Sequence, residues 1–264
     1  MNALVDEYVA SAAPVGSQTL VRHYLTDVSS ATVRSELMRL EAEGYALQPH
    51  TSAGRIPTHC GYRMFVNKLL LHEASDYPTP EEPVGRTPRV KTPALATALP
   101  LRVEALEAFG AIGAAEYEGS HHEPVDTLSA STGLLSLLLI QQPSSALYLR
   151  GLARLLAQPE FRDSAVLVPL LQVLESTSAL TSLLETSLRK RRFSVCVGIE
   201  SERGQLSSFS LVAERVRNEH YSGVLAVLGP MRMDYRKAIR SVDLVSRIID
   251  CGGRHDVRRD TLGC

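Results

Sequence analysis

The sequence predicts an α+β protein built in two parts. Short helical patterns and a turn-rich pair of strands fill residues 1–75, and proline then becomes dense in residues 76–100. In residues 101–250, apolar helical stretches are followed by strands rich in Val, Ile, Leu and Phe. We therefore expect an N-terminal helical domain, a proline-rich linker, a second α+β domain and, over residues 251–264, a disordered tail.

The first two helices are predicted to be short. Apolar residues have helical spacing at Leu4, Val5, Tyr8 and Val9. Pro14 ends this pattern, because its ring disfavours helix in the preceding residue. A second helix is expected from Ser17, whose hydroxyl can cap free backbone N–H groups, to Tyr24.

The third helix is predicted to begin at a serine cap, Ser29 or Ser30, and to end at Gly44. Its apolar stripe is Val33, Leu37 and Leu40. Short strands are expected from Tyr45 to Gln48 and at Ile56, around a turn that contains Pro, Ser and Gly. Thr58 is then expected to cap a fourth helix that ends near Glu73.

The second part reads as helices first and strands afterwards. Helical patterns cover Leu101–Gly119, Thr127–Gln141 and Ser164–Leu188, and the segment HHEPVD at residues 121–126 is expected to interrupt them. The strand candidates are FSVCVGIE, LSSFSLVAERV and GVLAVLGP. A last helix is predicted from Tyr235 to Ile249.

Composition excludes several classes of protein. The net charge of −1 gives no general attraction to nucleic acid, so any positive charge that meets DNA must be local. The longest apolar runs are shorter than the roughly 20 residues that cross a bilayer, and acids near the start argue against a secretory signal. We therefore expect a cytoplasmic protein with no membrane partner. The scattered cysteines, Cys60, Cys196, Cys251 and Cys264, favour idle thiols over a zinc site.

Three short helices, a tight turn before the third and a two-stranded tip describe a winged helix-turn-helix, whose third helix enters the DNA major groove. A groove about 12 Å wide admits a helix only when the side chains facing the bases are small, and Ser29 to Thr32 meet that condition. In the loop HTSAGR, Gly54 permits a close approach and Arg55 can enter the minor groove. The acids Glu36, Glu41 and Glu43 oppose this reading unless they lie away from DNA.

The predicted DNA-binding residues fall into five groups. Ser17, Ser29, Ser30 and Arg55 would position the protein, and Thr32, Arg34 and Ser35 would read bases. The remaining candidates are Gln18 and Thr19 on the second helix, Arg39 on the third, and His50, Thr51 and Ser52 in the loop. The alternative is that Ser29 to Thr32 only cap a helix and that Arg55 is a solvated loop residue.

Residues 7–70 resemble the N-terminal domain of the HrcA family of heat-inducible transcription repressors. The most specific motifs are PVGS (Pro14 to Ser17), VSSATVR (Val28 to Arg34), QPHTSAGRIPT (Gln48 to Thr58) and GYRMFV (Gly61 to Val66). Residues 227–249, VLGPMRMDYRKAIRSVDLVSRII, resemble the closing strand and helix of the family, and LLAQPEF (Leu155 to Phe161) resembles an internal motif.

The resemblance implies a homodimeric repressor that binds an inverted-repeat operator, CIRCE, upstream of chaperonin and chaperone operons. It also implies a GAF-like domain after the winged helix, and activity that depends on the GroE chaperonin. The chain departs from the family in a first helix that starts close to Met1, in Ala12 and Ala13 before the turn, and in a shorter, more proline-rich middle at residues 71–142. The last departure affects the region expected to form the dimer.

Other functions are less well supported by the sequence. A GAF-like domain could bind a small ligand, so a regulator controlled by a metabolite is the main alternative. Glycine-rich nucleotide loops, a G-x-S-x-G elbow and H-E-x-x-H are missing from the sequence, so we expect no enzyme and no cofactor. His121 and His122 could bind a metal but are more simply solvent residues of a connector, and we predict no metal site. The basic run at residues 189–192 more simply ends a helix than binds nucleic acid.

Overall fold

The computed structural model describes residues 1–76, 122–143, 145–189, 191–199 and 206–251. The N-terminal elements are α1 (Asn2–Ser11), α2 (Ser17–His23), α3 (Ser30–Ala42), β1 (Ala46–Leu47), β2 (Ile56–Pro57) and α4 (His59–Asp76). The predicted helices and strands of this part are confirmed to within a few residues. Leu4, Val15, Leu20, Val33, Leu37 and Ala46 form its small core.

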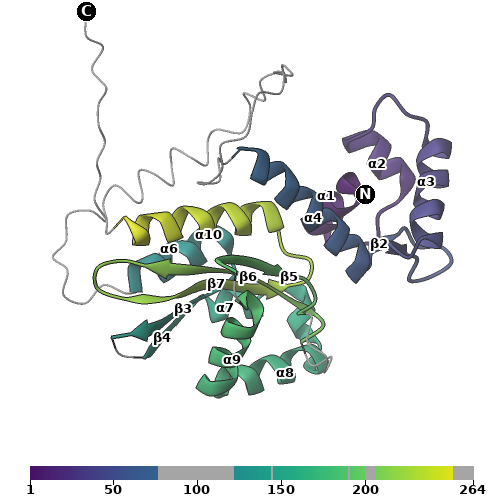
Figure 1. Ribbon diagram of the computed structural model, residues 1–264. Coiled ribbons are helices and arrows are strands. Elements are labelled where there is room, and N and C mark those ends of the chain that lie inside the picture. The colour runs from purple at the N-terminus through teal and green to yellow at the C-terminus, as the bar shows by residue number, and fades with distance from the viewer. Residues whose placement is uncertain (77–121, 144, 190, 200–205, 252–264) are drawn as a thin grey trace, which may run out of the picture.

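The second part is an antiparallel sheet covered by helices on both faces (Figure 1). Its elements are α6 (His122–Thr132), β3 (Leu135–Gln142), β4 (Ala146–Arg150), α7 (Leu152–Leu156), a 3-10 turn (Pro159–Arg162), α8 (Ser164–Glu175), α9 (Thr177–Leu188), β5 (Phe193–Cys196), β6 (Phe209–Arg217), β7 (Ser222–Pro230) and α10 (Tyr235–Asp250). The strand order is β4-β3-β7-β6-β5. The predicted fold class is therefore confirmed, with a winged helix followed by a GAF-like α+β sheet domain.

Side chains alternate between the two faces of this sheet because successive residues of a strand point in opposite directions. On β3, Leu138 and Ile140 face the layer of α6 and α10, whereas Leu137 and Leu139 face the layer of α7, α8 and α9. Both faces are buried. The three central strands can therefore be apolar along most of their length.

This burial explains the largest error of the sequence prediction. Residues 133–140, GLLSLLLI, were expected in a helix that ran to Gln141, but they form the end of a turn and the central strand β3. A continuous apolar run has no period that separates a doubly buried strand from a buried helix. The short elements β4 and α7 were not predicted.

Two helix boundaries also differ from the prediction. Residues 122–126, expected in a break between helices, form the start of α6, which begins at His122 with Pro124 in its first turn, where no backbone N–H is needed. Residues 164–188 form two helices, and Ser176 caps the second by accepting a hydrogen bond from the Ala179 N–H at 3.2 Å. The predicted helix over residues 101–119, the linker and the tail lie outside the described residues.

Within the described ranges, no single helix is long and apolar enough to cross a membrane. Only α8 and α9 taken together reach that criterion, and the chain bends by 99° between them.

The winged helix packs directly against the sheet domain. Tyr62, Phe65 and Val66 of α4 lie in the same apolar cluster as residues of β5, β6, β7 and α10. Polar contacts join α1 to the sheet domain: Arg236 of α10 binds Asp6 at 2.5 Å, and Arg232, which also binds Glu160, donates to the carbonyl oxygen of Val9. The winged helix is thus supported by the second domain.

Candidate nucleic-acid interface

The N-terminus of α3 is organised by Ser29. Its Oγ accepts a hydrogen bond from the Thr32 N–H at 3.1 Å and lies 2.9 Å from the Thr32 hydroxyl. Ser29 and Thr32 are both exposed. The first turn of the helix therefore presents hydroxyl groups and backbone N–H groups to the outside, which is the combination that binds phosphate oxygens at helix starts.

A hydrogen bond between side chains joins α2 to α3. The hydroxyls of Ser17 and Ser30 lie 3.0 Å apart. The predicted cap at Ser17 is wrong, because Gly16 occupies the N-cap position of α2 and the Ser17 hydroxyl turns to α3 instead. Above this contact is a shallow hollow lined by Gly16, Ser17, Gln18, Thr19, Ser30, Ala31 and Arg34. The hollow brings together predicted residues from both helices.

Arg34 provides positive charge at this hollow. Its side chain is exposed, and within the described part of the chain no carboxylate pairs with it. Arg39 differs, because Glu36 binds it at 2.9 Å and Glu43 lies 3.7 Å away. The charge of Arg39 is therefore balanced within its own helix, whereas that of Arg34 is available to a ligand.

The exposed face of α3 follows from helix geometry. Val33 and Leu37 are buried, and at about 100° per residue the opposite side of the helix carries Ala31 and Ser35. Thr32 and Arg34 lie on the two flanks of this face. Met38, which was not among the predicted residues, lies on the same face with 57% of its surface exposed. Its position off the apolar stripe was the signal in the sequence that marks it as outward-facing.

The wing, residues 46–57, consists of β1, β2 and the turn between them. At its tip His50, Thr51 and Ser52 are exposed. Gln48 holds the turn, since its Nε2 donates to the carbonyl oxygens of Thr51 at 3.0 Å and Ala53 at 2.8 Å. The tip is therefore a preformed, exposed loop.

Glycine is required at the base of the wing. A Cβ atom on Gly54 would lie 2.3 Å from the backbone carbon of Val15. The neighbouring Arg55 exchanges two backbone hydrogen bonds with Val15, each of 2.9 Å. These contacts fasten the wing to the turn that precedes α2.

Arg55 is engaged in an ion pair at the base of the wing. This residue lies at the base of the wing, and its Nε and Nη2 donate to Oε2 of Glu41 at 3.0 and 2.8 Å. Only 12% of its side chain is exposed. In this structure the charge of Arg55 holds the wing against the C-terminal half of α3, so contact with a minor groove would require a change of partner.

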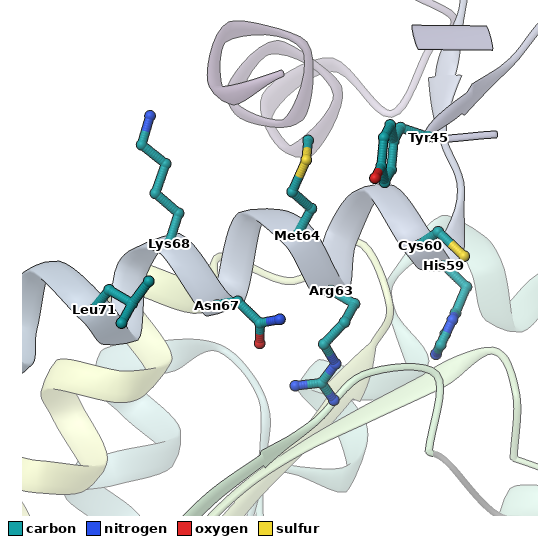
Figure 2. Close-up of a pocket in the computed structure, with 8 residues that line it drawn as sticks. All are labelled: Tyr45, His59, Cys60, Arg63, Met64, Asn67, Lys68 and Leu71. Carbon is teal, nitrogen blue, oxygen red and sulfur yellow. The ribbon is translucent and has the colours of Figure 1, made fainter. Parts of the chain in front are cut away.

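A second hollow runs along α4 (Figure 2), lined by Tyr45, His59, Cys60, Arg63, Met64, Asn67, Lys68 and Leu71. Two of these side chains bind the sheet domain: Arg63 donates to the carbonyl oxygen of Val195 at 3.1 Å, and His59 Nε2 lies 2.9 Å from that of Val197. They attach α4 to β5 and to the residue that follows it. Among the described residues, no group of three or more His, Cys, Asp or Glu side chains could hold a metal ion.

The predicted site residues thus occupy three places. The hollow between α2 and α3 and the adjoining face of α3 bring together Ser17, Gln18, Thr19, Ser29, Ser30, Thr32, Arg34 and Ser35. The wing tip carries His50, Thr51 and Ser52. Arg39 and Arg55 are engaged with acids of α3.

Comparisons with known proteins find one family over both the N-terminal and the C-terminal parts of the chain. A family model described as the HrcA protein C-terminal domain matches residues 112–239. The heat-inducible transcription repressor HrcA of Sorangium cellulosum (strain So ce56) is 30% identical in an alignment 320 residues long, and the alignment covers 91% of this chain and 92% of that protein. The repressor of the same name from Desulforudis audaxviator (strain MP104C) is 29% identical over 323 residues, with 94% of both chains covered.

The fold is shared with a solved structure. The crystal structure of a hypothetical protein at 2.2 Å resolution matches this chain with a TM-score of 0.65, at 16% identity and with 94% of both chains covered. Winged helix and sheet domain therefore recur together in one known architecture. Given this fold and the extent of the likeness to its relatives, the chain belongs to the HrcA family of heat-inducible transcription repressors.

Proposed function

We propose that this protein is a cytoplasmic repressor that binds, as a homodimer, the CIRCE inverted-repeat operator of chaperonin and chaperone operons and prevents their transcription at normal temperature. The observation that carries the proposal is the exposed N-terminal half of α3. It combines a capped helix start with hydroxyl side chains and an exposed arginine that no carboxylate of the described residues pairs with. This is the chemistry of a helix that enters the major groove by its N-terminal end.

The proposed roles follow from position. Ser17, Ser29 and Ser30, together with Gln18 and Thr19 on α2, bind phosphates where the two helices meet. Thr32, Arg34 and Ser35 face the bases, and Arg34 has the donors to bind guanine through two hydrogen bonds. His50, Thr51 and Ser52 bind the backbone from the wing tip. Arg39 lies further along α3, where a change of partner from Glu36 to phosphate would be needed.

Dimerisation is required by the size of the reading surface. One helix contacts only a few base pairs, whereas a genome offers roughly 10⁶ to 10⁹ competing sites. Two symmetric copies on an inverted repeat multiply their discrimination. Repression is then steric, because the bound dimer occupies the promoter.

Heat control in this proposal depends on the GroE chaperonin. The repressor needs chaperonin to reach its active fold, and misfolded proteins compete for the chaperonin after heat shock. Adding chaperonin to refolding repressor should raise the fraction that binds operator. An unchanged fraction across a chaperonin titration would contradict this part of the proposal.

Arg34→Ala tests the DNA-binding surface directly. Fluorescence anisotropy with an inverted-repeat duplex at fixed salt should show binding weakened by about 1–3 kcal/mol per half-site. Arg162→Ala is the matched control, because Arg162 is an exposed arginine on the second domain and should bind like the wild type. Equal affinities for the two variants would remove Arg34 from the interface. Light scattering of the same samples should give a dimer, free and on the duplex.

A further inference from the structure

The exposed face of α3 carries one large apolar side chain. Met38 is 57% exposed, although Val33 and Leu37 of the same helix are buried. It lies one turn after Arg34, on the face that also carries Ser35. An apolar group placed at the centre of this face loses contact with water only when another molecule covers it.

The neighbours of Met38 make it protrude. Ala31, Ser35 and Ala42 lie at seven and three residues before it and four residues after it, and all three are exposed. Helical residues at these spacings share one face. Because their side chains are short, the methionine is the tallest apolar group between Arg34 and the ion-paired Arg39.

We propose that Met38 reads thymine by contact with its C5-methyl group, and so selects an A·T pair at one position of each half-site. The inference rests on the proposed function, in which α3 lies in the major groove. The thymine methyl is the apolar group that base edges present there, and the other base edges present hydrogen-bond donors and acceptors. Apolar contact with a donor or acceptor would remove its water without replacing the hydrogen bond.

Methionine suits this contact physically. Its unbranched, polarisable side chain adapts to irregular surfaces. A single exposed apolar residue is common on proteins. The significance of Met38 comes from its place on a face that is otherwise small or polar, next to the exposed Arg34, which can bind the adjacent base.

The test removes the methyl group from the DNA. Each thymine of the inverted-repeat duplex is replaced in turn by uracil, symmetrically in both half-sites, and affinity is measured with the full-length protein. At one position the wild type should lose affinity about fourfold per half-site, the equivalent of ~0.8 kcal/mol for one buried carbon. Met38→Ala should bind more weakly and should bind thymine and uracil equally at that position. Met38→Leu should restore most of the preference.

A control and two results define the limits of the proposal. Met64→Ala, on α4, removes a half-buried methionine away from the reading face and should keep the wild-type response to uracil. Wild-type protein indifferent to uracil at every position would overturn the inference, as would Met38→Ala with an undiminished thymine preference. Failure of the wild type to bind any inverted-repeat duplex would instead refute the proposed function itself.

Discussion

Alanine replacement of Arg55 distinguishes a structural arginine from a DNA-binding one. The pair with Glu41 is partly shielded: 12% of the arginine side chain and 37% of the glutamate side chain are exposed. Exposed pairs contribute about 0–1 kcal/mol, and removing one partner of a fully buried pair costs about 3–5 kcal/mol. An intermediate coupling of about 1–2 kcal/mol is therefore expected between the two side chains.

The assay is a double-mutant cycle in urea, followed by circular dichroism. Arg55→Ala and Glu41→Ala should each destabilise the protein by about 2 kcal/mol, and the double variant should lose clearly less than their sum, by the expected coupling. A loss of this size shifts the urea midpoint by roughly 1 M.

Operator binding supplies the second measurement. Because Arg55 binds Glu41 and not phosphate, Arg55→Ala should leave the dependence of affinity on salt unchanged, whereas loss of a phosphate contact lowers the slope by about one for each contact. Additive stability effects, together with a reduced salt slope, would show that Arg55 leaves Glu41 and reaches DNA. The structural reading would then be refuted.

Two further pairs of variants test the packing of the winged helix and its contact with the sheet domain. The ring centroids of Tyr62 and Tyr235 lie 5.8 Å apart. The Tyr235 hydroxyl is hydrogen-bonded to the Ser210 hydroxyl at 2.7 Å and to the carbonyl oxygen of Met231 at 2.8 Å, whereas the Tyr62 hydroxyl has no partner among the described residues. Tyr235→Phe should therefore lower the free energy of unfolding by about 1–2 kcal/mol, whereas Tyr62→Phe should leave it unchanged or raise it slightly in thermal unfolding. The reverse order would contradict these hydrogen-bond assignments. Burial raises the pKa of both phenols above 10.0, so stability present below pH 10 should be lost as the pH rises further, and less steeply in Tyr62→Phe. Gly54→Ala should impair folding and operator binding, because its Cβ would lie 2.3 Å from the backbone of Val15. Gly16→Ala has open space around its Cβ and should change stability much less. Equal losses of stability in the two variants would disprove the close approach at Gly54.

The parts of this structure that depend on local chemistry could be predicted from sequence. The cap at Ser29 is a hydrogen bond between residues three apart, and the stripe of Val33 and Leu37 records which face of α3 is buried. The pairing of Arg55 with Glu41 was not predictable in this way, because a tertiary fold brings the two residues together. Similarly, β3 lies inside the sheet because β7, which is distant in the sequence, pairs with one of its edges while β4 pairs with the other.

The interface between the two domains bears on how a repressor with this architecture can be regulated. On α1, Leu4 lies in the core of the winged helix, and the next residue, Val5, lies in the core shared with the sheet. The same short helix therefore contributes to both cores, and α4 extends the second of them through Tyr62 and Phe65. An event that loosens the packing of α10 or β5 removes support from the helices that hold α3 in place. Loss of fold in the second domain is in this way coupled to loss of the reading surface, with no separate signal needed between them.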